Sequence, residues 1–235
     1  MTTTLTPTPA GHTVTPAPTP GRRVTDAATR TFHWLFAFSF VGAWLTAESE
    51  RWRLVHVTLG YTLAGLLAFR LLWGLVGPRP VRLSALWRKL AAWPGWLAGL
   101  RAGRPDGHQA QNLLMATAVA LLLLAVVPLT LSGYATYEEW GGERVGEWLE
   151  ELHELAANGM LALVLLHLGL IAGLSLLRGS NLARPMLTGC LPGPGPDLLT
   201  RRQRITAAFA AAVLAIAVIA FWWLQWVQTL AATQP

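Results

Sequence analysis

Cysteine is almost absent from this chain of 235 residues, which contains only Cys190. A single thiol cannot form an internal disulfide, and an iron–sulfur cluster held by cysteine needs several thiolates. The motif C-x-x-C-H, which attaches a c-type haem covalently, does not occur either. The sequence therefore excludes a disulfide framework, a thiolate-bound cluster and a covalently attached haem.

Charged residues are also scarce. They make up 13% of the chain, whereas apolar residues make up 53% and tryptophan occurs 12 times. Several uncharged runs approach the ~20 residues that cross a bilayer as a helix. This composition predicts an all-α integral membrane protein and argues against a water-soluble core. The net charge of +6 could indicate a nucleic-acid-binding protein, but the distribution of the basic residues explains it better as membrane topology.

The apolar runs predict five membrane-spanning helices. A basic, tryptophan-rich segment at 80–103 is expected to lie in the membrane interface as an amphipathic helix interrupted at Pro94. Residues 1–29, which include His12, are expected to form a disordered, uncleaved Thr/Pro-rich tail, and residues 190–204 a Gly/Pro-rich linker. The predicted spans cover residues 30–47, 53–76, 112–134, 151–177 and 205–228.

Lysine and arginine are distributed unequally between the two sides of the membrane. With five crossings, the tail, the segment 79–104 and the basic residues of 178–204 share one side, and the other side keeps only Arg51, Arg53 and Arg144. The positive-inside rule then places the N-terminus in the cytoplasm and the C-terminus outside. Acidic residues cluster in the outer loops, either as a docking patch for a basic partner or as an ordinary solvated surface.

Four histidines lie within the predicted spans. His153 and His167 are fourteen residues apart, about 1400° of helix rotation, so both rings leave one face of the helix ~21 Å apart along its axis. Counted inward from the outer boundary at ~1.5 Å per residue, His56 is level with His153, and His33 is level with His167. The crossed pairs would differ in depth by ~20 Å, which no single metal ion can bridge. The spacing therefore predicts two stacked sites.

Two histidines from different helices are too few ligands for most protein-bound metals. Zinc and copper sites usually have three or four protein ligands, and Glu154 is the only acidic or thiol side chain level with either pair. Two axial imidazoles suit haem b, because the macrocycle supplies the other four ligands of the iron. An iron with both axial positions filled favours electron transfer over catalysis at the metal. The alternative is four unrelated histidines that are satisfied by hydrogen bonds within the bundle.

Two further positions are ambiguous in the sequence. Gly60 lies one turn after His56 on the same face, where a missing side chain would admit either a flat macrocycle or a neighbouring helix. His108 precedes the third span in a hydrophilic loop, and we expect it to have a solvated or structural role.

A set of short motifs resembles one known family. In sequence order the motifs are DAATRTFHW at 26–34, HVTLGY at 56–61, RLLWG at 70–74, ELHE at 151–154, HLGL at 167–170 and NLARPMLTG at 181–189. Together they resemble the bacterial cytochrome b561 and Ni/Fe-hydrogenase b-type cytochrome family. The fifth helix lies outside the resemblance, and the segment around His108 departs from the family's usual G-H-N-P.

The resemblance implies a four-helix bundle over residues 30–189 that holds two b haems, with one extra C-terminal transmembrane helix. It implies that the axial ligands are His33, His56, His153 and His167, and the depths given above pair His56 with His153 and His33 with His167. It also implies that electrons pass between quinones in the membrane and redox partners at its surface.

The resulting hypothesis is a di-haem cytochrome of a bacterial inner membrane that connects the quinone pool with an outer partner, such as a hydrogenase or a c-type cytochrome. We expect an electron-transfer subunit of a respiratory oxidoreductase more than a stand-alone enzyme. Two alternatives stay open: a self-contained oxidoreductase, for example of the superoxide:quinone type, and a haem-free membrane anchor. Guanidinium groups could bind haem propionates at the two faces through paired hydrogen bonds; the candidates are Arg30, Arg51, Arg53, Arg178 and Arg184.

Overall fold

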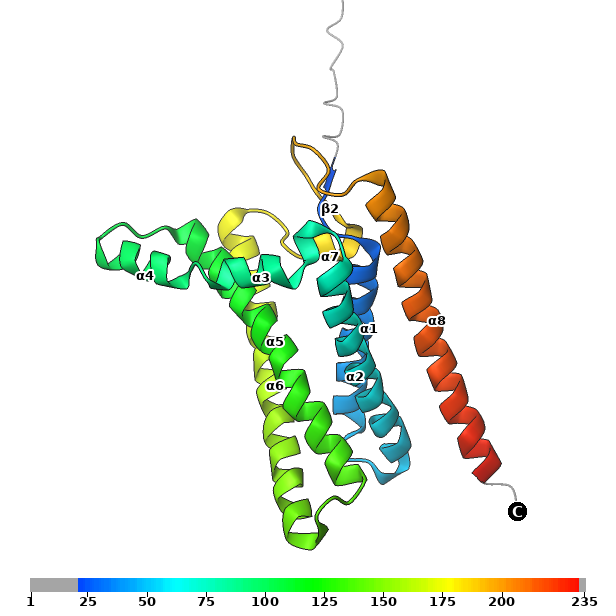
Figure 1. Cartoon of the computed structure of the whole chain (residues 1–235). Helices are drawn as coiled ribbons and strands as arrows, with labels where there is room; N and C mark the ends of the chain where they lie inside the picture. The colour runs from blue at the N-terminus through cyan, green and yellow to red at the C-terminus, as the bar shows by residue number, and fades with distance from the viewer. Residues whose placement is uncertain (1–20, 233–235) are drawn as a thin grey trace, which may run out of the picture.

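Long helices that run side by side account for most of the chain, and a computed structural model describes them over residues 21–232 (Figure 1). The tail expected for residues 1–20, with His12, lies outside the described residues. In chain order the elements are β1 (Arg22–Arg23), α1 (Ala27–Thr46), the 3-10 helix η1 (Glu50–Trp52), α2 (Arg53–Val76), the 3-10 helix η2 (Arg79–Val81), α3 (Leu83–Leu90), α4 (Trp93–Arg101), α5 (Gly107–Tyr137), α6 (Gly142–Arg178), α7 (Arg184–Thr188), β2 (Cys190–Leu191) and α8 (Arg201–Ala232).

Four helical segments within residues 21–232 are long and apolar enough to cross a membrane. They are Glu50–Val76, Gly107–Tyr137, Gly142–Arg178 and Arg201–Ala231. The fold is therefore an all-α membrane helical bundle, as the composition predicts. Helix α1 does not reach the same apolarity, although its 20 residues extend for ~30 Å and it lies against α2 (Figure 1). Its crossing of the membrane stays a prediction.

The buried core lies where α1, α2, α5 and α6 meet. Its largest cluster contains Phe40, Leu63, Leu67, Val126, Leu129 and Met160. Helix α8 packs on the outer side of α1 and α2, because Leu214 joins Phe32 and Leu66 in a second cluster. Toward its C-terminus α8 leans away from the bundle, and Trp222 Nε1 donates a 3.2 Å hydrogen bond to Thr62 Oγ1. The fifth helix thus shares buried clusters with α1 and α2 but has no residue in the largest cluster.

Hydroxyl groups inside the long helices bond to the backbone of their own helix. Thr58, Thr62 and Ser132 each donate to the carbonyl oxygen four residues earlier, at 2.6–2.7 Å. An unbonded hydroxyl in hydrocarbon costs free energy, and this local bond removes that cost without a partner helix.

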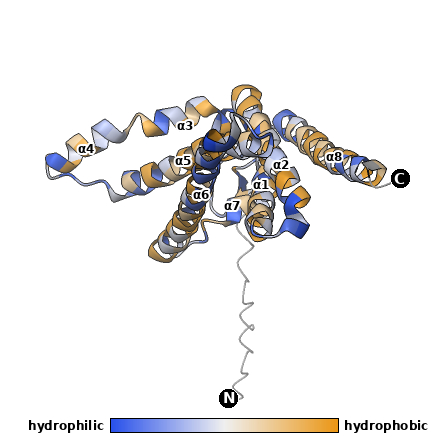
Figure 2. Cartoon of the chain, turned by 90° about the horizontal axis from the view of Figure 1, so that it is seen from below, coloured by the Kyte–Doolittle hydropathy of each residue, from blue (hydrophilic) through white to orange (hydrophobic). Residues whose placement is uncertain are grey.

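Helices α3 and α4 project sideways from one end of the bundle (Figures 1 and 2). The sequence predicts a broken amphipathic helix here, but the break is wrongly placed at Pro94. The two helices separate at 91–92, and Pro94 lies in the first turn of α4, where no backbone N–H is needed for an intrahelical bond. Trp93 and Trp96 fasten α4 to the bundle through hydrogen bonds to Thr117 Oγ1 and to the Asp106 carbonyl.

A short antiparallel ribbon joins two segments that the sequence assigns to a tail and a linker. Strand β1 pairs with β2, with Arg22 opposite Leu191 and Arg23 opposite Cys190. Residues 22–29 therefore form a strand, a cap and the start of α1 instead of continuing the predicted tail. Two-residue strands have too few alternating positions for a periodic signal, which is why the sequence does not reveal them.

Asp26 connects the start of α1 to α2. Its carboxylate accepts hydrogen bonds from Thr29 N and Thr29 Oγ1 at 2.8 and 2.9 Å, and a 3.3 Å bond from Trp73 Nε1. Only 2% of Asp26 is exposed. The residue is both the N-cap of α1 and the acceptor for a buried indole.

The first prediction compares Asp26→Ala with Asp106→Ala, which removes the exposed N-cap of α5. Asp26→Ala should lower the free energy of unfolding by about 1–3 kcal/mol, because it also leaves the buried Trp73 N–H without an acceptor. Asp106→Ala should cost about 0.5–1 kcal/mol, since only a cap is lost. Thermal unfolding in one detergent checks this; equal losses in the two variants would contradict the structural role given to Asp26.

Candidate functional site

The four histidines of the predicted spans lie on three helices. His153 and His167 are on α6, His56 is near the start of α2, and His33 is in the second turn of α1. All four are half-buried. Helix α6 thus contributes one imidazole to each end of the bundle, and α2 and α1 contribute the other two.

The rings of His56 and His153 lie close together in a T-shaped arrangement. Their centroids are 6.1 Å apart and their planes are inclined at 83°. A metal–imidazole bond is about 2 Å long and the ring centroid lies about 1 Å further on, so two imidazoles on opposite sides of one ion have centroids about 6 Å apart. The separation therefore fits two axial ligands of a single metal.

Backbone carbonyls orient both of these rings. His56 Nδ1 lies 2.9 Å from the carbonyl oxygen of Ala43, and His153 Nδ1 lies 3.0 Å from that of Leu129. A carbonyl only accepts hydrogen bonds, so each Nδ1 carries the proton. Each Nε2 then keeps its lone pair, which is the tautomer that a metal-binding histidine requires.

Gly133 on α5 gives the His153 ring its space. A Cβ atom at position 133 would lie 2.7 Å from Cε1 and 2.9 Å from Nδ1 of His153. Such distances are too short for real contacts, so any side chain here would displace the ring. This role is not apparent in the sequence, because Gly133 is far from His153 in the chain and carries no functional group.

His33 and His167 have a different environment. The Nδ1 atoms of both are buried and have no hydrogen-bond partner in the part of the chain that the structure describes. A buried polar nitrogen without a partner costs free energy. Unlike the rings of His56 and His153, these two rings are therefore not oriented by a backbone carbonyl among the described residues.

No protein atom occupies the space that a side chain at position 60 would fill. No heavy atom lies within 4 Å of a Cβ built at this position. The glycine therefore does not serve close packing of a neighbouring helix, and a flat group can approach the backbone here.

The remaining metal-ligand candidates do not join these pairs. Among residues 21–232 no cluster of three or more His, Cys, Asp or Glu side chains is placed to hold a metal ion. Glu154 is exposed, and His108 is exposed with its Nδ1 3.2 Å from Asn112 Nδ2. Two imidazoles on their own fit a metal that brings most of its own ligands.

Four of the five arginines considered for haem propionates contact other groups of the protein. Arg178 Nε donates to Gln111 Oε1 at 2.6 Å, and an Arg30 terminal nitrogen donates to the Leu187 carbonyl at 2.9 Å. The Arg53 guanidinium lies 5.9 Å from the centroid of the Tyr137 ring. Arg51 stacks on its neighbour Trp52, and Arg184 is exposed. Their role toward propionates stays a prediction.

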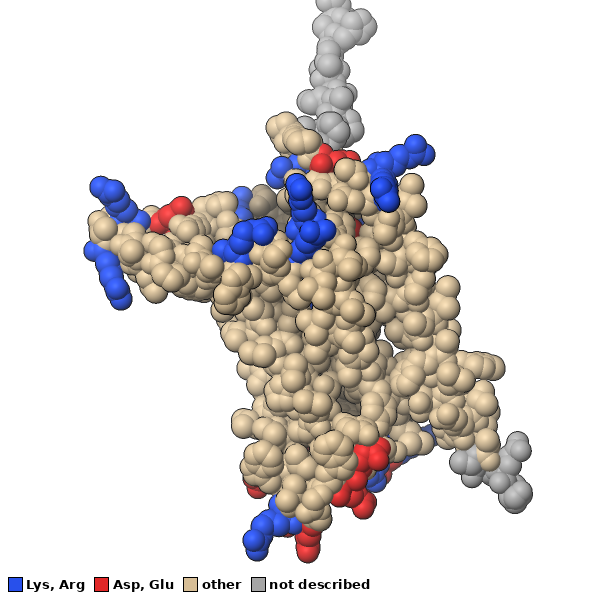
Figure 3. Space-filling view, viewed as in Figure 1, with Lys and Arg blue, Asp and Glu red and all other residues tan. Residues whose placement is uncertain are grey.

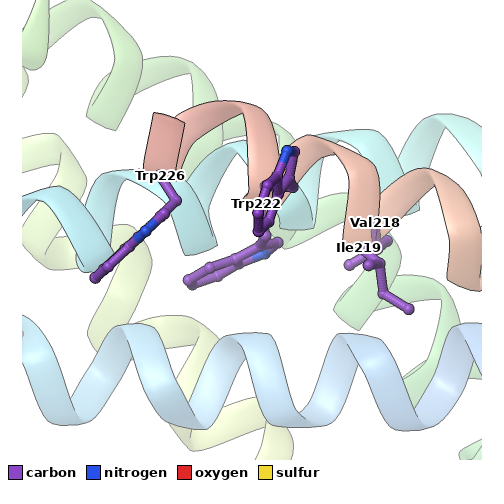
Figure 4. Close-up of a pocket in the computed structure, with 5 residues that line it drawn as sticks. Val218, Ile219, Trp222 and Trp226 are labelled. Atoms are coloured by element: carbon purple, nitrogen blue, oxygen red, sulfur yellow. The ribbon is translucent and has the colours of Figure 1, made fainter. Parts of the chain in front are cut away.

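An apolar hollow of ≈600 Å³ lies along the C-terminal half of α8. Figure 4 shows Val218, Ile219, Trp222 and Trp226 lining it on the side that faces the bundle. It holds no ionisable side chain, and the four histidines do not line it. The hollow is therefore separate from the histidine pairs.

Basic and acidic side chains separate toward the two ends of the molecule. In Figure 3 most of the Lys and Arg residues lie at the end that carries α3, α4 and the ribbon, and acidic residues gather at the opposite end. The opposite end contains the turn between α5 and α6, with Glu138, Glu139 and Glu143. The unequal distribution of Lys and Arg among the loops of the sequence predicts this asymmetry.

Comparison with protein families gives one match. The model described as prokaryotic cytochrome b561 matches residues 24–189. The searches of curated proteins and of solved structures gave no significant match.

The second prediction concerns Gly133→Ala. The new methyl group should push the His153 ring away from α5 and disrupt its arrangement with His56, so purified protein should contain less haem b than the unmodified protein. The matched control is Gly159→Ala on α6, where a Cβ would meet nothing within 4 Å. Haem-to-protein ratios measure both; an unchanged ratio in Gly133→Ala would contradict the assigned contact.

Proposed function

The chain belongs to the prokaryotic cytochrome b561 family, a family of membrane b-type cytochromes that transfer electrons, and we propose that it binds two haems b with histidine at both axial positions of each. His56 and His153 form the outer site, and His33 and His167 form the inner site. The protein then carries electrons across the membrane between these two sites.

The observation that carries this proposal is the pairing of His56 with His153. These residues are 97 positions apart in the sequence, yet their ring centroids lie 6.1 Å apart with both Nδ1 atoms bonded to carbonyls. Helix packing alone has no need of two inward imidazoles with free Nε2 atoms in an apolar bundle. Axial ligation gives both nitrogens a partner.

The inner site is supported by the spacing along α6. His167 follows His153 by fourteen residues, which returns the side chain to about the same face of the helix. His33 on α1 is level with His167 when residues are counted inward from the outer boundary. A second haem held at the Nε2 atoms of these two residues would form the inner site.

Haem, when bound, supplies a centre that gains and loses one electron. The protein holds each centre in position and keeps water away from the path between them. Met160 lies seven residues from His153 and seven from His167, and it is fully buried with Phe40, Leu63 and Val126. This apolar layer separates the two sites, so an electron moves between them through a dry interior.

We further propose an inner-membrane protein with its basic end in the cytoplasm. The gathering of arginine at the end with α3, α4 and the ribbon supports this orientation through the positive-inside rule. The outer site then lies near the acidic surface around Glu138, Glu139 and Glu143, which suits a redox partner with a basic face. The quinone pool is the proposed exchange partner within the membrane.

The third prediction uses the four single variants His33→Ala, His56→Ala, His153→Ala and His167→Ala. Each should reduce the haem content from two to about one, and the two members of a pair should lose the same haem, because a haem held from one side only is poorly retained. Redox titration of the α-band identifies which haem remains. His108→Ala is the matched control, since this exposed histidine lies outside both pairs.

Two results would oppose the proposal. The absence of a Soret band from the dithionite-reduced protein would contradict the cytochrome assignment. It would favour the alternative of a haem-free membrane anchor. Retention of both haems by His56→Ala and His153→Ala would show that the outer pair is not a ligand pair.

A further inference from the structure

A cavity of ≈370 Å³ lies between the start of α1 and the start of α8. Its basic lining consists of Arg23, Arg30, Arg201 and Arg204, and below them Ile205 and Ala208 form an apolar wall. Nothing in the proposed electron path uses the arginines of α8. We propose that this cavity binds the phosphate group of an anionic glycerophospholipid, independently of the proposed redox function.

The positive charge of the cavity is largely uncompensated. Asp26 is the only acidic residue in the lining, and its oxygens are already bonded to Thr29 and Trp73. Arg204 lies 3.8 Å from Asp197, but the two side chains are 37% and 41% exposed, and an ion pair so open to water contributes little. The guanidinium groups are therefore available to an incoming anion.

Arg30 also lacks a partner inside the cavity. Its Nε atom is buried and makes no hydrogen bond to the described residues, although one terminal nitrogen donates to the Leu187 carbonyl. A guanidinium offers five donors in a planar fork that matches phosphate oxygens. A phosphate in the cavity would satisfy the buried Nε and bring the arginines of α1 and α8 to a common ligand.

The order of residues along α8 favours a lipid over inorganic phosphate. Arg201, Arg204, Ile205 and Ala208 are spaced i, i+3, i+4 and i+7, so they form one stripe of the helix. The stripe is cationic at the end of the membrane-spanning segment and apolar further along that segment. A phospholipid has the same order, a charged headgroup followed by acyl chains. Free phosphate has no apolar group that could contact the apolar wall. Basic pockets between helices at a membrane surface are known sites for anionic headgroups.

Such a lipid would also hold α8 to the core. The matched family region ends at residue 189, and α8 follows it. Helix α8 contacts α1 in its first half and diverges later. A headgroup bound by Arg30 of α1 and by Arg201 and Arg204 of α8 would join the added helix to the bundle at its charged end.

The test titrates delipidated protein in neutral detergent micelles with phosphatidylglycerol, phosphatidylcholine of the same acyl chains, or inorganic phosphate. Bound lipid is counted by native mass spectrometry, and the shift of the unfolding temperature is measured in parallel. The variant is Arg201→Gln/Arg204→Gln, and the matched control is Arg202→Gln, an exposed arginine of the same turn that does not line the cavity.

We expect one phosphatidylglycerol per chain in the unmodified protein and in Arg202→Gln, with a higher unfolding temperature. Loss of two charge-assisted contacts should weaken binding to Arg201→Gln/Arg204→Gln at least about tenfold. Equal binding by that variant, equal stabilisation by phosphatidylcholine, or the full effect from inorganic phosphate would each overturn the proposal. If the double glutamine variant does not fold, Arg201→Lys/Arg204→Lys retains the charge without the fork and should show weakened binding.

Haem content is recorded on the same samples. It should be unchanged in all the arginine variants, so a failure of the lipid proposal is distinguishable from a failure of the cytochrome assignment.

Discussion

Hydrocarbon offers no hydrogen bonds, so every polar group in a membrane-spanning helix needs a partner within the protein. Hydroxyl groups in this chain meet the requirement locally, as Thr58 and Ser132 do with carbonyls of their own helices. Imidazoles cannot do so completely, because one ring nitrogen is left over after Nδ1 has bonded to a carbonyl. This leaves the Nε2 atoms of His56 and His153, whose rings come from different helices and have centroids 6.1 Å apart.

Helix α6 has the central position in that arrangement. It packs most extensively against α5, and α5 supplies both the carbonyl of Leu129 and the space at Gly133 for the His153 ring. Helices α1 and α2 then present His33 and His56 from the other side of the bundle. The position of the His153 ring thus depends on α5, which carries none of the four paired histidines, and that of the His56 ring depends on Ala43 of α1.

Periodic features of the structure could be predicted from the sequence, and non-periodic ones could not. The spacing of His153 and His167 identifies a common helix face because 3.6 residues per turn is a rigid rule. The ends of α5 and α6 extend beyond the predicted apolar spans, since a helix continues into water wherever its polar residues permit. The roles of Asp26 and Gly133 depend on contacts with distant residues, Trp73 and His153, which no local pattern records. The β1–β2 ribbon is missed for the same reason.

That ribbon has a topological consequence. It pairs residues 22–23 with 190–191, immediately outside the matched region 24–189, so the core begins and ends at one point. The ribbon therefore holds the two ends of the four-helix unit together. Segments before β1 and after β2 can be gained, lost or exchanged without rerouting any core helix. Helix α8 is then joined to the four-helix unit through one point of the chain, although it packs along α1 and α2.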